Sequence, residues 1–242
     1  ILSGSVAESN IQPLAKHLSQ IGAPLVHVEV VPDNEERIIE STQRILNNHS
    51  RFLFTSGGIG PTHDDITYNS IARTFNQTVQ FHQPTLDKMS AFYGHPVTPE
   101  SDRKSRMALI PEKAECLAVE GLWVPVVVVE KRVLILPGIP RLFNRMLPTA
   151  MQYLPQSHEK MEINLKTTLA ESQLAEALEK IQQTYAKVAT LGSYPATDPS
   201  HNYKVKISIR GCSSDAKQLN NIAHQIDKVL TRIDENHRVE EK

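Results

Sequence analysis

Cysteine and aromatic residues are scarce in this chain. Only Cys116 and Cys212 occur among 242 residues, they lie in different segments, and aromatic residues make up 5% of the chain. Two distant thiols give neither a disulfide framework nor a zinc ligand pair. This excludes the disulfide-stapled class and favours a reducing compartment.

An excess of positive charge is absent as well. Lys and Arg number 26 against 27 Asp and Glu, which leaves a net charge of −1. A broad nucleic-acid surface needs clustered cations, so we expect no nucleic-acid partner. No apolar run reaches the length of a membrane span, so we expect no membrane partner. We expect a cytoplasmic location, with mitochondrial and nuclear alternatives open because a targeting signal upstream of Ile1 is compatible with this sequence.

The first part of the chain alternates strand and helix patterns. Helical spacing of apolar residues occurs in 14–21 and again after Asp33. Strands are predicted at residues 25–31, 52–55, 124–129 and 132–136. The last two flank Glu130-Lys131, which indicates a hairpin. This alternation predicts an α/β domain at residues 1–155, in three layers, with a mostly parallel sheet and helices on both faces.

After Pro155 the pattern restarts and predicts a small α+β domain at residues 158–242. Strands are expected at 161–167, 188–194 and 203–210, and helices at 168–185 and 215–233. Thr168 and Glu171 have the spacing of a capping box for the first of these helices. The tail from Asp234 is polar, and we expect it to fray. The order of elements is therefore βαββα.

The run Thr55–Thr67 carries the strongest chemical signal. It follows the apolar strand Phe52-Leu53-Phe54, contains three glycines and two adjacent aspartates, and precedes a predicted helix, Tyr68–Phe75. Glycine turns at a helix N-terminus expose backbone N–H groups that bind anions, and adjacent carboxylates bind divalent cations. The run therefore indicates a site for a phosphate ester or pyrophosphate. The competing interpretation is that Asp65 only caps the next helix.

Other motifs accompany this run at the expected edge of the sheet. Leu136–Arg141 is a second rigid turn after a strand, which also suits a plain strand-to-helix connection. Asp33 suits a catalytic role or, with Glu36 three residues on, a capping box. Asn10 precedes a helix and is read first as its N-cap. Arg103 lies in a polar stretch, where it reaches a bound pyrophosphate or is merely solvated.

Together these motifs resemble the molybdopterin-binding domain family, which includes enzymes that adenylylate molybdopterin, bacterial competence-damage-inducible proteins and the N-terminal domain of eukaryotic FAD synthase. The resemblance runs through Gly4–Asn10, Asp33, Thr55–Thr67 and Leu136–Pro140. It is greatest to the FAD-hydrolase-like domain of eukaryotic FAD synthase. The second domain resembles the KH-like domain that follows this fold in such relatives, with Gly192–Pro195 as its marker.

Two departures from the family pattern stand out. Family members start with a strand that ends in Gly-Asp-Glu just before the position of Ile1, so one pocket carboxylate is expected to be absent from this chain. Where many members have Asn-x-x-Gly-x-x-Pro-Gly, Glu120 replaces the Asn and Val126 the Gly. Chains like eukaryotic FAD synthase resemble this variant more closely.

The resemblance implies a metal-dependent pyrophosphatase that cleaves FAD, ADP-ribose or a similar ADP-linked compound into mononucleotides. The expected catalytic residues are Asp65, Asp64 and Asp33. Asp64 and Asp65 would hold Mg²⁺ or Co²⁺, with K⁺ a further candidate, and Asp33 would be another ligand or a base. Substrate and phosphate binding is expected at Gly57, Gly58, Gly60, Thr62, Thr67, Asn10, Pro137, Gly138, Pro140 and Arg103.

Two other functions fit the same motifs. The turn suits the phosphate of a pterin, which predicts binding or adenylylation of molybdopterin. A non-catalytic regulatory or oligomerisation module related to FAD synthase is the third hypothesis. In every case the expected small-molecule partner is a nucleotide or a pterin phosphate. The resemblance further implies a homo-oligomer, either a dimer or a trimer.

Overall fold

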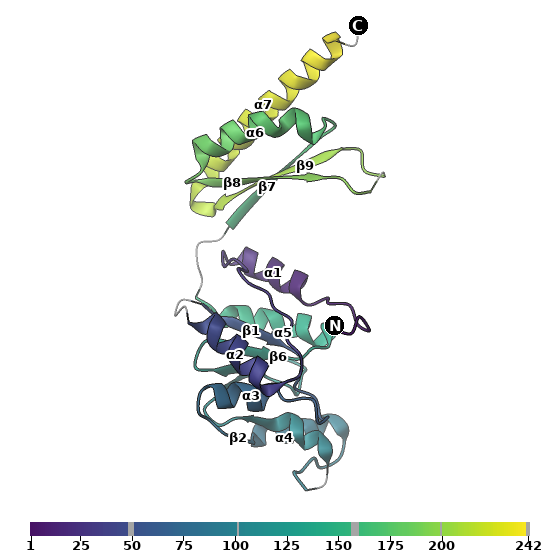
Figure 1. Cartoon of the computed structure of the whole chain (residues 1–242), viewed down its shortest axis with the longest axis vertical. Helices are drawn as coiled ribbons and strands as arrows, with labels where there is room; N and C mark the ends of the chain where they lie inside the picture. The colour runs from purple at the N-terminus through teal and green to yellow at the C-terminus, as the bar shows by residue number, and fades with distance from the viewer. Residues whose placement is uncertain (48–50, 101, 156–159, 199, 241–242) are drawn as a thin grey trace. The chain divides into compact units, whose positions relative to one another are not determined.

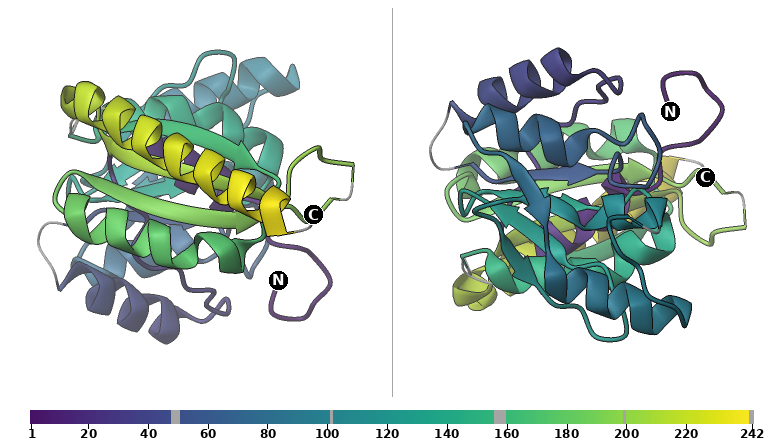
Figure 2. Two further views of the ribbon diagram at one scale, coloured as in Figure 1. Left: turned by 90° about the horizontal axis from the view of Figure 1, so that it is seen from above. Right: turned by 90° about the horizontal axis from the view of Figure 1, so that it is seen from below.

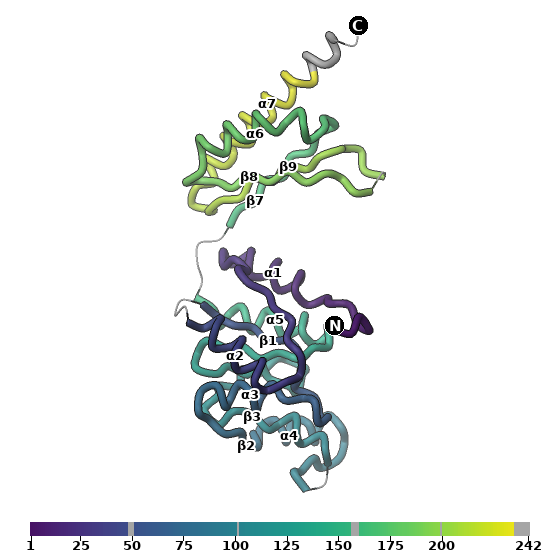
Figure 3. Tube along the Cα trace, in the orientation of Figure 1, coloured from purple at the N-terminus to yellow at the C-terminus, as the bar shows by residue number. Residues whose placement is uncertain are grey.

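The computed structural model describes residues 1–47, 51–100, 102–155, 160–198 and 200–240 (Figures 1 and 3). The chain divides into two compact units. The first contains Ile1–Leu18 and Pro24–Pro155, and the second contains Ser19–Ala23 and Gln156–Lys242. Each unit has a sheet and helices of its own. No helix among the described residues combines the length and apolarity needed to cross a bilayer.

The N-terminal unit is built on a four-stranded sheet in the order β1-β6-β5-β4. Its strands are β1 (Leu53–Ser56), β4 (Glu115–Leu117), β5 (Val126–Val129) and β6 (Val133–Leu136). The β1–β6 pair is parallel, while β5–β6 and β4–β5 are antiparallel. The prediction of a mostly parallel sheet is therefore wrong for the described strands. The β5–β6 hairpin and the short strand β4 supply the antiparallel pairs.

The hairpin predicted around Glu130-Lys131 is confirmed. Val127 pairs with Ile135 and Val129 with Val133, and all four side chains are buried. Glu130 and Lys131 both have positive φ angles, 50° and 55°. Two such residues in succession make the tight turn whose twist matches that of the flanking strands.

Residues 25–31 do not form the predicted strand. This segment pairs with no strand of the described part of the chain, and its alternate side chains Val26, Val28 and Val30 are 64%, 47% and 39% exposed. An alternating apolar pattern becomes a strand only when a neighbouring strand satisfies its backbone groups. Residues 25–31 therefore have the side-chain pattern of a strand but no neighbouring strand to pair with among the described residues.

Five helices accompany the sheet: α1 (Ile11–Gln20), α2 (Glu35–Leu46), α3 (Thr67–Thr74), α4 (Gln83–Tyr93) and α5 (Pro140–Tyr153). Helix α5 packs on β5 and β6 through Phe143, Met146 and Leu147, which are at most 1% exposed. Helix α2 packs against β1 and α3. The N-cap of α2 is Asn34, whose side chain accepts a hydrogen bond from the Arg37 N–H, so Asp33 is not the cap.

A small subdomain follows α3; its helix α4 matches the helix that the sequence predicts around Leu86–Tyr93, whereas its strands and 3-10 helix were not predicted. Strands β2 (Val79–Phe81) and β3 (Leu109–Pro111) form an antiparallel pair, and residues Arg103–Ala108 form a 3-10 helix, η1. A cluster of Leu86, Met89, Val97 and Ala108 joins α4 to this segment. These strands are three residues long, too short for a periodic pattern to reveal.

The C-terminal unit has the predicted βαββα order. It contains β7 (Lys160–Thr167), α6 (Glu171–Tyr185), β8 (Ala189–Pro195), β9 (Val205–Cys212), the 3-10 turn η2 (Ser213–Asp215) and α7 (Ala216–Glu240). The strands form an antiparallel sheet in the order β7-β9-β8. Helices α6 and α7 both lie across one face of this sheet (Figure 2).

Two details of the C-terminal unit differ from the predictions. The N-cap of α6 is Ala170, and Gln173 accepts a hydrogen bond from its N–H at 2.8 Å, so Thr168 and Glu171 do not form the capping box. Helix α7 continues through the polar tail to Glu240 instead of ending at Ile233. At the start of α6 and at the end of α7 the sequence is polar, and such a sequence is compatible with several positions for the helix boundary.

Candidate functional site

The candidate site lies where β1 and β6 end. Because these strands are parallel, Ser56 and Leu136 are in register and the two glycine turns leave the sheet at the same edge. The Gly57 N–H donates to the Leu136 carbonyl at 3.1 Å. A Cβ on Gly138 would stand 3.1 Å from the Gly57 Cα, so the two turns touch through backbone atoms. Gly57 and Gly58 also have positive φ angles, 104° and 66°.

Asn10 fastens these turns to a third segment. Its Nδ2 group donates to the Ser56 Oγ at 2.8 Å and to the Gly138 carbonyl at 2.9 Å. The residue is 7% exposed, and its Oδ1 atom is buried without a hydrogen-bond partner among the described residues. Asn10 does stand at the N-cap position of α1, where its carbonyl accepts from the Leu14 N–H at 3.2 Å, but its side chain joins the two turns instead of capping the helix, and we call this arrangement the clasp. Ser56, the clasp's partner, was missed, and only its place at the end of a strand before Gly57 pointed to it.

Helices α1, α3 and α5 all begin beside this clasp. Helix α1 starts immediately after Asn10, α3 starts at Thr67 and α5 starts at Pro140. The N-cap residues of α3 and α5, Ile66 and Ile139, form no side-chain capping bond. Helix N-termini carry partial positive charge and unsatisfied N–H groups, so their convergence favours an anion.

Helix α1 differs from the other two because a carboxylate already faces its N-terminus. The Glu8 Oε1 atom accepts hydrogen bonds from the N–H groups of Asn10 at 2.6 Å and Ile11 at 3.0 Å. This arrangement also positions Asn10 for its contacts with the two turns. The starts of α3 and α5 are thus the ends that remain without a side-chain cap.

Thr67 holds the glycine turn in shape. Its hydroxyl donates to the Gly57 carbonyl at 3.0 Å, and its N–H donates to the Gly58 carbonyl at 2.9 Å. A Cβ on Gly58 would lie 2.2 Å from the Thr67 Oγ1, so no larger residue fits there without displacement. Thr67 is 7% exposed, and its contacts are those of a support for the turn.

The two aspartates differ in their environments. The Asp65 Oδ2 atom accepts hydrogen bonds from the Thr62 N–H at 2.9 Å and from the Thr62 hydroxyl. Asp65 is not the N-cap of α3, a position occupied by Ile66, but it closes the loop on Thr62. A Cβ on Gly60 would lie 2.5 Å from the same carboxylate oxygen.

Asp64 is exposed, whereas Asp65 is partly buried. The neighbouring Thr62 side chain, and after it the backbone N–H of Asp64 itself, hold the pKa of Asp64 below its ordinary value. Asp64 is therefore ionised at neutral pH and suited to bind a cation.

Asp64 and Asp65 suit a metal ion that is shared with a substrate phosphate better than one that is held by protein ligands alone. No group of three His, Cys, Asp or Glu side chains comes together as a metal cage within the described ranges. Mg²⁺ is commonly held by one or two carboxylates together with substrate phosphates and water. Asp64 and Asp65 therefore fit a cation shared with a bound phosphate, but not one held by the protein alone.

Two predicted residues are not joined to the turns. Asp33 is exposed before α2, and Arg103 is exposed at the start of η1. No hydrogen bond or ion pair of the described residues links either side chain to Gly57–Thr67 or Pro137–Pro140. The neighbouring Lys104 pairs with Asp102 at 3.3 Å and lies 4.8 Å from the Tyr93 ring centroid. Of the second turn, Pro137 is buried and Pro140 is the first residue of α5.

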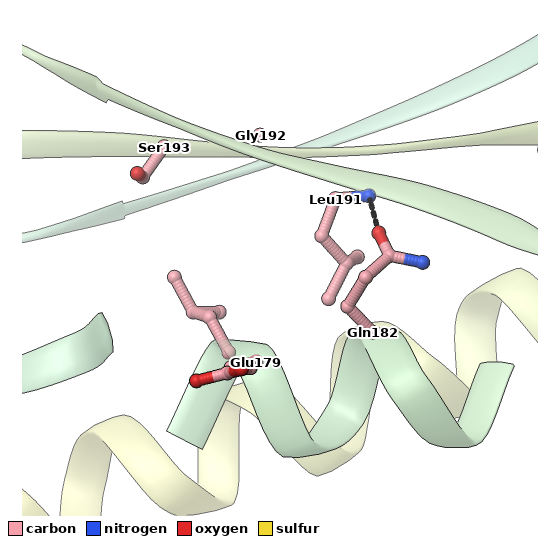
Figure 4. Close-up of a pocket in the computed structure, with 6 residues that line it drawn as sticks. Glu179, Gln182, Leu191, Gly192 and Ser193 are labelled. Atoms are coloured by element: carbon pink, nitrogen blue, oxygen red, sulfur yellow. Dashed lines mark hydrogen bonds between the residues drawn. The ribbon is translucent and has the colours of Figure 1, made fainter. Parts of the chain in front are cut away.

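A separate hollow lies in the C-terminal unit, between α6 and β8 (Figure 4). Its volume is about 190 Å³, and its lining includes Leu178, Leu191 and Ser193. Gln182 closes one side, where its Oε1 atom accepts from the Leu191 N–H at 2.6 Å and its Nε2 group donates to the Ala189 carbonyl at 2.9 Å. The hollow is smaller than typical ligand pockets of about 300–1,000 Å³, so we assign it no binding role.

Comparison with known proteins finds a family model that matches each unit. The family described as "Probable molybdopterin binding domain" matches residues 1–156, and the family "FAD synthase, middle domain" matches residues 161–237. Because the first match covers more than half of the chain, this protein belongs to the molybdopterin-binding domain family.

Individual relatives agree with this assignment. A competence-damage inducible protein of Clostridioides difficile (strain 630) is 30% identical over 168 residues, which cover 68% of this chain and 40% of the relative. A competence-damage inducible protein of Clostridium botulinum (strain Kyoto / Type A2) is 30% identical over 201 residues, which cover 78% of this chain and 48% of the relative. The chain thus spans less than half the length of these curated relatives.

One solved structure supports the fold. The crystal structure of the protein CinA, of unknown function, from Thermoplasma acidophilum superposes with a TM-score of 0.56 at 25% identity. The match covers 64% of this chain and 92% of that protein. The chain is therefore an α/β molybdopterin-binding domain that is followed by a unit related to the middle domain of FAD synthase.

Proposed function

We propose that this chain hydrolyses the pyrophosphate of a dinucleotide, FAD, ADP-ribose or a similar compound, in a reaction that depends on a divalent metal ion. The observation that supports the proposal most is the Asn10 clasp, which joins two glycine turns where three helices begin. A pyrophosphate carries two adjacent negative groups, and this edge offers backbone N–H groups and positive helix ends to both.

The chain's own residues would have distinct tasks in this reaction. The turn at Gly57, Gly58 and Gly60 would bind one phosphate through the backbone N–H groups of Gly58 and Gly60, because the Gly57 N–H already donates to the Leu136 carbonyl. The turn Pro137–Pro140 with the start of α5 would bind the other. Thr62 and Thr67 would keep the first turn in shape. Asn10 would hold the two turns together for the substrate through its bonds to Ser56 and Gly138.

Asp64 and Asp65 would hold Mg²⁺ or Co²⁺ against the phosphate, and the ion would polarise the phosphoryl group and lower the pKa of a bound water. In the reaction, a water oxygen bonds to one phosphorus while the bond from that phosphorus to the bridging oxygen breaks. The products are two phosphate monoesters, AMP with FMN or AMP with ribose 5-phosphate. Asp33 is retained as a candidate base, and Arg103 as a residue that reaches the substrate from η1.

The test is release of AMP from FAD and from ADP-ribose by the purified chain with Mg²⁺ or Co²⁺. Asp64→Asn, at an exposed position, is expected to lower the rate about 100-fold or more, the range for loss of an electrostatic catalytic group. Asp227→Asn on α7 removes the same charge at an exposed position and is the matched control. Intact FAD and ADP-ribose with every metal, or equal rates for both variants, would refute the proposal.

Two other functions have support of their own. The printed description of the matched family, a molybdopterin-binding domain, favours a pterin phosphate at the same turns. The Asp65 carboxylate already accepts a hydrogen bond from the Thr62 N–H of its own loop. This structural role of Asp65 favours a non-catalytic module that binds a nucleotide without turnover. Binding of molybdopterin in preference to FAD would select the first, and binding of FAD without release of AMP would select the second. The proposed homo-oligomer, a dimer or a trimer, is tested by the mass of the chain in solution.

A further inference from the structure

The C-terminal unit carries a polar surface on the face of its sheet opposite α6 and α7. The strands alternate strictly between the two faces. Leu165, Ile207 and Ile209 pack into the core beneath the helices. The in-register row Lys166, Lys206 and Tyr194 therefore points to the opposite face. We call this surface the open face and define it by Lys160, Glu162, Lys166, Gly192, Tyr194, Lys206, Ser208 and Arg210, of which Glu162 and Arg210 form an ion pair at 3.4 Å.

The open face is cationic, in contrast to the chain as a whole. Its charged strand residues are four cations, Lys160, Lys166, Lys206 and Arg210, and one carboxylate, Glu162. Four positive charges and one negative charge give +3 on this face, whereas the whole chain has −1. A concentration of one sign on a single sheet face favours an anionic ligand.

Aromatic rings lie among these cations. The Lys206 Nζ atom is 5.2 Å from the Tyr194 ring centroid, and the Arg210 guanidinium carbon is 5.7 Å from it. At the other end of the row, the Lys166 Nζ atom is 4.8 Å from the Tyr203 ring centroid. Tyr194 is 41% exposed, so its ring is accessible to a planar ligand. Rings beside cations bind a base by stacking and a phosphate by charge.

The centre of the open face contains an unpaired polar group. Ser208 is 1% exposed, and its Oγ atom has no hydrogen-bond partner among the described residues. Its register partner is Gly192, where a Cβ would lie 2.9 Å from atoms of the Tyr194 ring. Glycine at 192 thus lets the ring lie across the sheet beside Ser208.

We propose that the open face binds a nucleotide, with its base stacked on Tyr194 and its phosphates on Lys206, Lys166 and Arg210. Charge complementarity favours this ligand over a second copy of the same face, because two such copies would bring like charges together. This site is separate from the glycine turns and does not depend on hydrolysis there.

The experiment is hydrogen–deuterium exchange of the full chain with and without saturating ADP, in EDTA so that no metal-dependent turnover contributes. ADP is expected to slow exchange severalfold in peptides that cover β8 and β9. The double variant Lys206→Glu/Arg210→Glu is expected to lose this protection and to bind ADP at this face about tenfold more weakly or worse, as loss of charged hydrogen bonds requires. Lys228→Glu, exposed on α7, is the control for a change of charge.

Further variants separate stacking from folding. Tyr194→Phe retains the ring and is expected to keep the protection, whereas Tyr194→Leu is expected to weaken binding about fivefold or more. A far-ultraviolet dichroism melt of each variant verifies the fold. Protection confined to residues 55–67 would overturn this inference while leaving the proposed function intact. Protection by single-stranded octaadenylate but not by ADP would also overturn it, in favour of a nucleic-acid surface.

Discussion

Replacement of Asn10 by aspartate tests the clasp with almost no change of shape. The Asn10 Nδ2 group donates to the Ser56 Oγ and the Gly138 carbonyl, and the residue is 7% exposed. An ionised aspartate at this position would place an acceptor oxygen against the Gly138 carbonyl and bury a charge. We expect the pKa of the introduced carboxyl in the folded chain to lie above the unfolded value of about 3.9.

The sign of the pH dependence follows from this raised pKa. At low pH the neutral acid donates to the Gly138 carbonyl, so one of the two hydrogen bonds survives. As pH rises through the unfolded value the variant loses stability, and the loss levels off above the folded pKa. A rise of about 1.5 pK units corresponds to about 2 kcal/mol.

We expect Asn10→Asp to cost about 2 kcal/mol near pH 4.5 and about 3 kcal/mol near pH 8, from the lost hydrogen bond and the buried charge. Asn10→Ala is the control. It removes both bonds and should cost about 2–3 kcal/mol with no added dependence on pH. Urea unfolding monitored by the fluorescence of Trp123, the chain's single tryptophan, reports the N-terminal unit. Equal stability of Asn10→Asp and the parent chain near pH 8 would refute the clasp.

Three further predictions concern stability. Lys131→Gly should raise the free energy of unfolding by about 1 kcal/mol in urea, because Lys131 has φ 55° and glycine adopts this conformation without strain; a loss would contradict the turn. Tyr68→Phe should gain about 1 kcal/mol by removing a buried hydroxyl without a partner in the described residues. Burial raises the pKa of Tyr68, so the parent chain should lose stability above about pH 10 more steeply than the variant, and parallel alkaline profiles would contradict this reasoning. Gly58→Ala should cost about 2 kcal/mol or more, since its Cβ would collide with the Thr67 hydroxyl at a positive φ; an unchanged melting temperature would show that the turn adapts.

The sequence predicted those elements whose patterns are long or carry special residues. The β5–β6 hairpin followed from two apolar runs around Glu130-Lys131, and the βαββα order followed from clear helical and alternating periods. The strand predicted at residues 25–31 failed because alternation reports a propensity and not a partner. The antiparallel pairing of β4 was missed because three residues give no measurable period.

The candidate site was predicted in part for a similar reason. Gly57 and Gly58 have positive φ angles, which glycine adopts without strain, and this local requirement can be read from the sequence. The contact of Gly138 with Gly57 and the bond of Asn10 to Ser56 join residues far apart in the chain. Such contacts depend on the register of β1 with β6, which no local pattern encodes. The engagement of Asp65 with Thr62 likewise became visible only in three dimensions.

The most direct measurement is a crystal structure of the chain with ADP-ribose and Mg²⁺. It should show the diphosphate at the ends of β1 and β6, within hydrogen-bonding distance of the backbone N–H groups of Gly58 and Gly60, and the ion beside Asp64. A diphosphate bound only elsewhere, with both glycine turns free of ligand at saturating ADP-ribose, would contradict the account.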